Sequence, residues 1–150
     1  MSTILDDSTN ESLAYNLSKS IKINIVTDTI KKLINSNKIL ISTNIFIHSA
    51  QGAHYTSPIF QEILKKHNIG QSMSRRGTCW DNAPQESFFW HLKDEIDIKD
   101  CNTFEEVLKD INEYMDYYNN YQDQWNLKKM TPVKYRNHLL NTPLTIISLF

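Results

Sequence analysis

Strand-like and helix-like segments alternate over the first 95 residues of the chain, and only helix-like segments follow them. Apolar side chains recur at helical spacing in the longer segments, and the shorter ones are apolar or alternating runs beside polar turns. This alternation predicts an α/β fold in which helices pack on a sheet. The predicted elements are a hairpin over residues 2–17, strands at 44–48 and 70–74, and helices over about 24–37, 58–67 and 84–95.

The later segments carry clear signals for helix starts. Thr103 and Glu106 form a capping-box pattern, and Thr131-Pro132 opens a last short helix. One face of the first of these helices is expected to be buried, with Phe104, Leu108, Ile111, Met115 and Tyr118. We expect one domain over residues 1–140 and an apolar tail over 141–150, whose partner the sequence does not identify.

The composition is that of a globular chain rather than a disordered or membrane protein. Of its 150 residues 40% are hydrophobic and 22% charged. No apolar run approaches the roughly 20 residues that span a bilayer, and the acidic N-terminal stretch lacks a signal pattern, so a cytoplasmic location is expected. The two cysteines, Cys79 and Cys101, form no CxxC pair, which favours reduced thiols over a zinc site.

The net charge of −1 hides an uneven distribution. Residues 94–116 hold nine acids against two lysines, whereas residues 124–150 hold four basic residues and no acid. Because a strong basic footprint is missing, charge alone gives only weak support to a nucleic-acid partner.

Three strings of rare residues carry a family resemblance. They are "HSAQGAHY" from His48, "SMSRRGTCWDNAPQESFF" from Ser72, and a distal "YYN", "L" and "TPVKY" ending at Tyr135. In order and spacing they resemble the integrase core of bacterial insertion-sequence transposases, DDE recombinases with a ribonuclease-H-like fold. The family pattern reads H-S-D-Q-G-x-x-Y, then S-M-S-R-x-G-x-x-x-D-N-A-x-x-E-S-F-F. The resemblance covers roughly residues 1–140 and implies DNA as the partner.

The resemblance implies a chemistry that needs three carboxylates. Together they would hold two Mg²⁺ ions about 3.5–4 Å apart, which activate the attacking oxygen and stabilise the leaving one. Glu86 matches the family's glutamate, 36 residues after position 50, as a D-x35-E spacing requires. Without the family, a glutamate in the first turn of a helix compensates the helix dipole.

The chain departs from the family at the other two acids. The second aspartate of the pattern falls on Ala50, whose methyl group cannot ligate a metal. The first belongs to a first, central strand ahead of the hairpin, and that strand appears in no segment of this sequence. Asp6 and Asp7 align with the second strand instead. The expectation is an N-terminally truncated, incomplete integrase core in which Glu86 alone is an insufficient metal site.

Several other matching residues are candidates for contact with DNA or for positioning. Lys93 lies on one helix face with Glu86 and Trp90, although a plain surface ridge is an equal alternative. Gln122 replaces an arginine of many relatives, which removes a further phosphate contact. The DNA-contact candidates are Arg75, Arg76, Lys93, Lys128 and Lys129, and the positioning candidates are His48, Gln51, Gly52, Asp81 and Asn82.

Some of these candidates, and the aromatic cluster of the distal helix, also have structural explanations. Asp81 and Asn82 are typical helix caps, and His48 at a strand end favours a hydrogen-bonded positioning residue over a general base. The aromatic cluster of the distal helix could stack on bases, but at helical spacing it is more often core. This cluster comprises Tyr114, Tyr117, Tyr118, Tyr121 and Trp125.

We therefore expect a transposase-family protein of DNA integration that is a catalytically inactive remnant. Two alternatives stay open. The first is a fragment that binds DNA, a second copy of itself or an intact transposase, and that inhibits the intact transposase. The second is a structural protein without a partner. If strand 1 is missing, strands 2 and 4 of the family order 3-2-1-4-5 would face a gap of roughly 10 Å. The hairpin would then slide over to pair with residues 44–48 or hang loosely.

Overall fold

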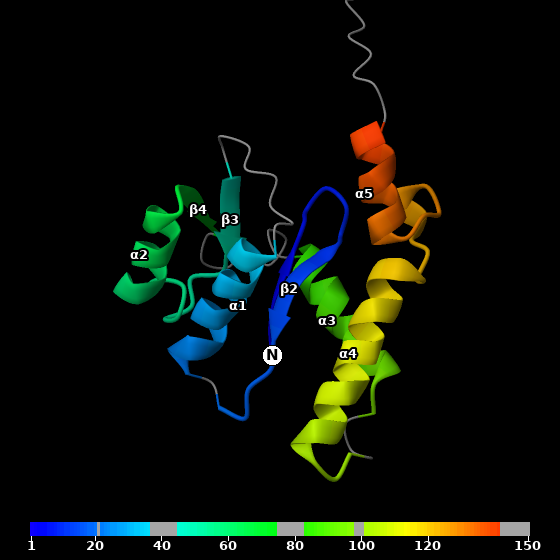
Figure 1. The fold of residues 1–150 in the computed structure, drawn as a ribbon, viewed down its shortest axis with the longest axis horizontal. Coiled ribbons are helices and arrows are strands. Elements are labelled where there is room, and N and C mark those ends of the chain that lie inside the picture. Colours follow the sequence, from blue (N-terminus) through cyan, green and yellow to red (C-terminus); the bar gives the residue numbers. More distant parts are fainter. Residues whose placement is uncertain (21, 37–44, 75–82, 98–100, 142–150) are drawn as a thin grey trace, which may run out of the picture.

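A computed structural model gives the structure of residues 1–20, 22–36, 45–74, 83–97 and 101–141. Within these ranges the predicted alternation of strands and helices is confirmed, with boundaries shifted by one or two residues (Figure 1). The elements are β1 (Ser2–Leu5), β2 (Ser12–Asn16), α1 (Ile23–Asn35), β3 (Ile45–Ser49), α2 (Pro58–Lys66), β4 (Ile69–Met73), α3 (Ala83–Glu95), α4 (Phe104–Asn120), the 3₁₀ helix η3 (Trp125–Leu127) and α5 (Pro132–Asn141).

The N-terminal hairpin is antiparallel, with Ser2 opposite Asn16 and Ile4 opposite Ala14, and its register shifts after Ile4. Its turn is closed by the backbone bonds from Asp6 N to Glu11 O (2.9 Å) and from Asn10 N to Asp6 O (2.7 Å). Asn10 has a φ of 56°, in the left-handed region that asparagine tolerates better than most residues. Local turn chemistry therefore determines this hairpin, as the sequence predicts.

The second strand pair is parallel. Ile45 lies opposite Ile69 and Ser49 opposite Met73, and α2 forms the connection between the two strands. Ser57 caps α2 by accepting a bond from Phe60 N, and Pro58 follows at the first helical position. Gly70 lies directly beneath the Phe46 ring, where a Cβ would come within 2.4 Å of a ring carbon. A side chain at position 70 would therefore require the exposed Phe46 ring to shift.

In the part of the chain that the structure describes, the two pairs form separate two-stranded sheets. The order β1-β2 and β3-β4 agrees with the predicted positions 2, 3, 4 and 5 of the family sheet. Residues 2–5 do not take a central place between β2 and β3. The hairpin has not moved over to pair with β3 either.

The expectation of a loosely attached hairpin is wrong. The hairpin lies between α1 on one side and α3 and α4 on the other (Figure 1). Ile4 packs against a core of α1, α2 and β4, which contains Ile25, Val26, Ile30, Phe60, Leu64 and Ile69. Leu5 and Tyr15 pack against a second core of α3 and α4. Because both faces of the hairpin are covered by apolar helices, it joins the two cores.

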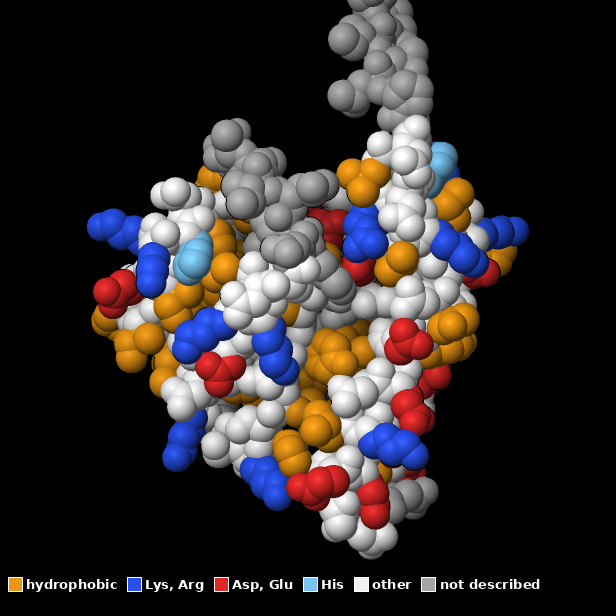
Figure 2. Space-filling model, in the orientation of Figure 1, with side chains coloured by type: hydrophobic (Ala, Val, Ile, Leu, Met, Phe, Trp, Pro, Cys, Tyr) orange, Lys and Arg blue, Asp and Glu red, His pale blue; other side chains and the backbone are white. Residues whose placement is uncertain are grey.

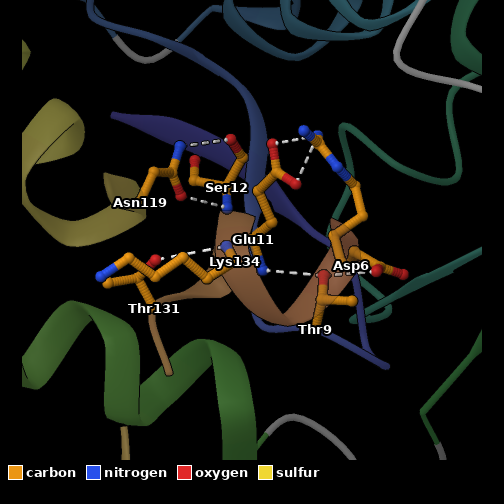
Figure 3. A network of polar contacts seen from close by, with 8 residues as sticks. Asp6, Thr9, Glu11, Ser12, Asn119, Thr131 and Lys134 are labelled. Carbon is orange, nitrogen blue, oxygen red and sulfur yellow. Dashed lines mark hydrogen bonds and ion pairs between the residues drawn. The ribbon is translucent and has the colours of Figure 1, made fainter. Parts of the chain in front are cut away.

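The hairpin tip is also held by hydrogen bonds from the C-terminal helices (Figure 3). Asn119 of α4 accepts from Ser12 N (2.9 Å) and donates to Ser12 O (3.0 Å). Arg136 of α5 donates from Nη1 to both carboxylate oxygens of Glu11, at 2.8 and 2.6 Å. Asn10 donates to the Gln124 side chain at 2.8 Å. We call this set of contacts the tip clamp; within it, Asn119 satisfies the backbone N–H and C=O of Ser12.

The second core divides the predicted aromatic cluster. Tyr114 and Tyr118 are buried against Phe88, and burial raises the pKa of both phenols. Tyr117, Tyr121 and Trp125 are exposed, so the prediction that the whole cluster is core is wrong for these three. Leu108, predicted on the buried face, is 37% exposed, whereas Tyr114 packs against Phe88. The predicted capping box of α4 is confirmed.

The two buried tyrosines allow a matched stability test. Tyr114 OH has no hydrogen-bond partner among the described residues, whereas Tyr118 OH donates to Asn10 O at 3.0 Å. Tyr114→Phe is expected to raise the free energy of unfolding by about 1 kcal/mol, and Tyr118→Phe to lower it by about 1 kcal/mol. Urea unfolding followed by circular dichroism measures both. Equal destabilisation by the two variants would contradict this assignment of the hydroxyls.

Candidate active site and DNA-binding surface

The turn after β3 holds the position where the family pattern has an aspartate. Ser49 is buried at the strand end, and Ala50, the next residue, is exposed. Gly52 O accepts bonds from Tyr55 N (3.0 Å) and Thr56 N (3.2 Å), and Gln71 of β4 donates to Ser49 Oγ (3.3 Å) and to Tyr55 O (2.9 Å). These bonds fix the backbone of the turn. Gln51 is exposed and has no hydrogen bond in the described structure.

His48 connects the two strands of the parallel pair. Its Nδ1 lies 2.9 Å from Ser72 Oγ and its Nε2 lies 2.9 Å from Ser74 Oγ. Because both ring nitrogens already have partners, His48 is placed to hold the strand ends rather than to accept a proton from a substrate. This geometry suits the positioning role expected from the sequence.

Glu86 lies in the first turn of α3 and is exposed. The neighbouring Gln85 donates from Nε2 to Thr3 O at 3.4 Å, which ties the start of α3 to β1. Trp90 and Lys93 are exposed on the same helix. The Trp90 and His91 rings meet edge-on, with their centroids 5.6 Å apart. The opposite side of α3 is buried through Phe88 and Leu92.

The described side chains do not gather a metal-binding set. Among them, no three His, Cys, Asp or Glu residues lie close enough together to hold a metal ion. Asp6 instead accepts a bond from the Thr9 hydroxyl at 2.5 Å within the hairpin turn, and Asp7 is exposed. The predicted site residues Arg75, Arg76, Asp81 and Asn82, and also Cys79, lie outside the described residues. The Sγ atom of Cys101 donates to a carboxylate oxygen of Asp110 at 3.3 Å.

Exposed lysines lie on α5 and on the loop before it. Figure 2 shows Lys and Arg side chains over α5 and the loop before it, whereas Asp and Glu side chains follow α4. Lys128, Lys129 and Lys134 are exposed. Within the described part of the chain none of these three forms an ion pair, while Arg136 is engaged by Glu11. The charge asymmetry seen in the sequence is therefore also an asymmetry in space.

Comparison of the sequence with known protein families identifies the family of this chain. Residues 1–79 match the model of one integrase core domain family, and residues 86–140 match a second model with the same description. The chain belongs to the integrase core family. The resemblance inferred from the sequence motifs is thereby confirmed.

The sequence relatives of this integrase-core chain are transposases. It is 39% identical over 142 residues to an uncharacterized transposase-like protein of Haemophilus influenzae, which covers 94% of this chain and 64% of that protein. It is 38% identical over 138 residues to the putative transposase InsK for insertion sequence element IS150 of Escherichia coli, covering 91% of this chain and 48% of InsK. The chain thus spans about half to two thirds of the length of these relatives. It belongs to a family of transposases and integrases.

Solved integrase cores share its fold. The catalytic core domain of BIV integrase superimposes with a TM-score of 0.67 at 17% identity, covering 91% of this chain and 84% of that one. The HTLV-2 integrase catalytic core in complex with magnesium gives 0.60 at 15% identity, covering 87% and 80%. The predicted ribonuclease-H-like integrase-core fold is confirmed. In the described part of the chain, no helix has the length and apolar character needed to cross a bilayer.

Sequence reasoning missed one part of this integrase core, the tip clamp, and described a second part incompletely. The tip clamp joins Glu11 to Arg136, residues 125 positions apart, and no local pattern announces such a pair. The second part is the loop before α5, where Trp125 is 83% exposed beside Lys128 and Lys129. At helical spacing, three and four positions after Trp125, the sequence has Lys128 and Lys129 rather than apolar residues. This is the signal that could have separated Trp125 from the core tyrosines.

Proposed function

We propose that this integrase-core protein contacts DNA in the cytoplasm but has no strand-transfer activity of its own. The observation that carries the proposal is Ala50, exposed directly after β3 at the position where the family pattern has a metal-binding aspartate. Glu86 is then the one residue of the family's acidic set that the chain supplies in the matching position.

The donor set does not fit the pair of magnesium ions that the family chemistry uses. Magnesium needs hard oxygen ligands in tight octahedral geometry, and two ions between them need several carboxylates. The methyl group of Ala50 has no lone pair, and the described residues contain no cluster of three acidic, His or Cys side chains. We therefore derive no catalytic step through a metal in this chain.

The features that support DNA contact are electrostatic. Lys93, Lys128 and Lys129 are exposed, and residues 124–141 contain no acidic residue. Lysine ammonium groups neutralise phosphates without reading sequence. Arg75 and Arg76 precede Gly77 in the family motif and are proposed as further phosphate contacts.

Duplex binding is expected to be weak, because the acids of α4 lie beside the basic surface. It is also expected to be independent of sequence and strongly reduced by salt, because the lysines contact phosphates. Titration of labelled duplexes of two unrelated sequences at low and at physiological salt measures this. The double variant Lys128→Gln/Lys129→Gln is expected to reduce the slope of log affinity against log salt by about 2. Tight binding that distinguishes the two sequences at physiological salt would contradict the prediction.

A second candidate is inhibition of an intact relative. It is favoured by the preserved core, which superimposes on BIV integrase over 91% of the chain, and by the trimeric form of the HTLV-2 core structure. A chain with a preserved core but Ala50 would enter such an assembly without contributing a complete site. Adding it to an intact transposase is then expected to lower transposition, whereas a protein that only contacts DNA weakly would leave transposition unchanged at physiological salt.

A further inference from the structure

The loop of residues 124–130, which we call the Trp125 loop, is a closed unit with a fixed backbone. Gln124 and Met130 form an antiparallel bridge, with Gln124 N bonded to Met130 O at 3.0 Å. Lys129 N donates to Gln124 O at 3.0 Å, and Met130 N donates to Leu127 O at 3.0 Å. Leu127 is 3% exposed and Thr131 is fully buried, so both anchor the loop in the protein. The loop is therefore a rigid projection rather than a loose connection.

The backbone of this loop is strained at its two lysines. Lys128 has a φ of 55° and Lys129 a φ of 60°, both in the left-handed region that residues with a Cβ adopt at a cost of about 1–2 kcal/mol each. Glycine or asparagine would relieve the strain, and both lysine side chains are exposed, so burial does not require lysine at either position. Strain kept at exposed residues points to a role outside the fold.

The side chains that the loop presents combine a flat apolar face with positive charge. The Trp125 indole is 83% exposed, the largest exposed fraction among the exposed large hydrophobic residues of the described chain. Lys129 Nζ lies 4.4 Å from the centroid of its ring, a cation–π contact that occupies one ring face. Asp123, one residue before the loop, is the nearest acid in the sequence, and the loop itself contains none.

A partner for this loop must offer a flat surface to the indole and negative charge to the lysines. Unpaired nucleotides offer both, since every base has a π-face and every nucleotide a phosphate. In a duplex the base faces are stacked inside the helix, so the indole could reach one only after unstacking it. An acidic peptide would match the lysines but would leave the indole face exposed.

We propose that the Trp125 loop binds unpaired nucleotides of single-stranded DNA. The free face of the Trp125 indole stacks on one base, and Lys128 and Lys129 contact the flanking phosphates. The proposal rests on the proposed function in that DNA is the partner, and it names the form of DNA that this surface takes.

The test compares a labelled oligothymidine of about 15 nucleotides with a duplex of the same length, using fluorescence anisotropy. Trp125→Ala is expected to weaken binding to the single strand by about tenfold and to change binding to the duplex by less than about twofold. Trp90→Ala is the matched control, because Trp90 is also exposed, at 66%, and lies near Lys93 on α3. It is expected to leave single-strand binding unchanged. Thermal unfolding checks that each variant is folded.

The outcomes separate this inference from the proposed function. If the wild-type chain binds neither DNA form at low salt, the proposed DNA contact falls and this inference falls with it. If the duplex binds but Trp125→Ala retains full single-strand affinity, or loses both affinities equally, only the inference about the Trp125 loop is overturned. A change of sedimentation in Trp125→Ala without any change in DNA affinity would mean that the indole serves self-association, and this also overturns it.

Discussion

Replacing Arg136 with alanine is expected to lower the free energy of unfolding by about 3 kcal/mol. The Glu11 side chain is 1% exposed, and Arg136 Nη1 lies 2.8 and 2.6 Å from its two oxygens. Without the guanidinium, the buried carboxylate loses both of its short charge-assisted bonds to Arg136. Because a domain of this size is stable by only about 5–15 kcal/mol, such a loss is large. Urea unfolding followed by circular dichroism measures it.

Two further variants show whether the charge partner is the cause. Lys134→Ala removes an exposed cation from the same helix and is expected to change stability by less than about 0.5 kcal/mol. Adding Glu11→Gln to Arg136→Ala is expected to recover part of the loss, because an amide costs less to bury than a carboxylate. If Arg136→Ala were no more destabilising than Lys134→Ala, the tip clamp would not stabilise the hairpin as described.

The elements of this fold could be predicted because each has a local cause. Ser57-Pro58 determines the start of α2, and Thr103 with Glu106 determines the start of α4. The apolar spacing of Ile25, Val26 and Ile30 identifies the buried face of α1. Turn chemistry around Asn10 identifies the hairpin. The family motifs then gave the order of the strands, which the local signals alone do not contain.

The way the hairpin is held could not be predicted from local signals. It depends on contacts between residues more than 100 positions apart, such as Ser12 with Asn119 and Glu11 with Arg136. From the sequence, Glu11 looks like an ordinary exposed acid of a turn, and Arg136 like one of the four basic residues of the C-terminal region. Only the contacts of 2.6 and 2.8 Å between them in the structure show that they are a pair.

The candidate site was predictable as far as the motifs reach. His48, Ala50 and Glu86 were identified from their order and spacing, and the structure adds their exposure and partners. The aromatic cluster shows the opposite case. Helical spacing cannot tell Tyr118, which faces Phe88, from Tyr121, which lies just past the end of α4 and is 67% exposed. Because α4 ends at Asn120, the helical spacing no longer applies to Tyr121.

Restoring one carboxylate is not expected to restore catalysis. Ala50→Asp would place an acid after β3, but with Glu86 it would give two carboxylates of the family's three. Asp6 does not supply the third in this structure, because it is bonded to Thr9 within the hairpin turn. The Ala50→Asp variant is therefore expected to remain as inactive as the unchanged chain.

Strand cleavage and joining by the purified 150-residue chain test the central claim most directly. The assay uses labelled DNA ending in insertion-sequence termini, with Mg²⁺ or Mn²⁺, an intact transposase as the positive control and Glu86→Ala as the matched blank. Because the donor set at Ala50 and Glu86 does not fit a metal pair, we predict that the unchanged chain gives no more product than Glu86→Ala with either metal. Metal-dependent product from the unchanged chain, reproducibly above that of Glu86→Ala, would contradict the account.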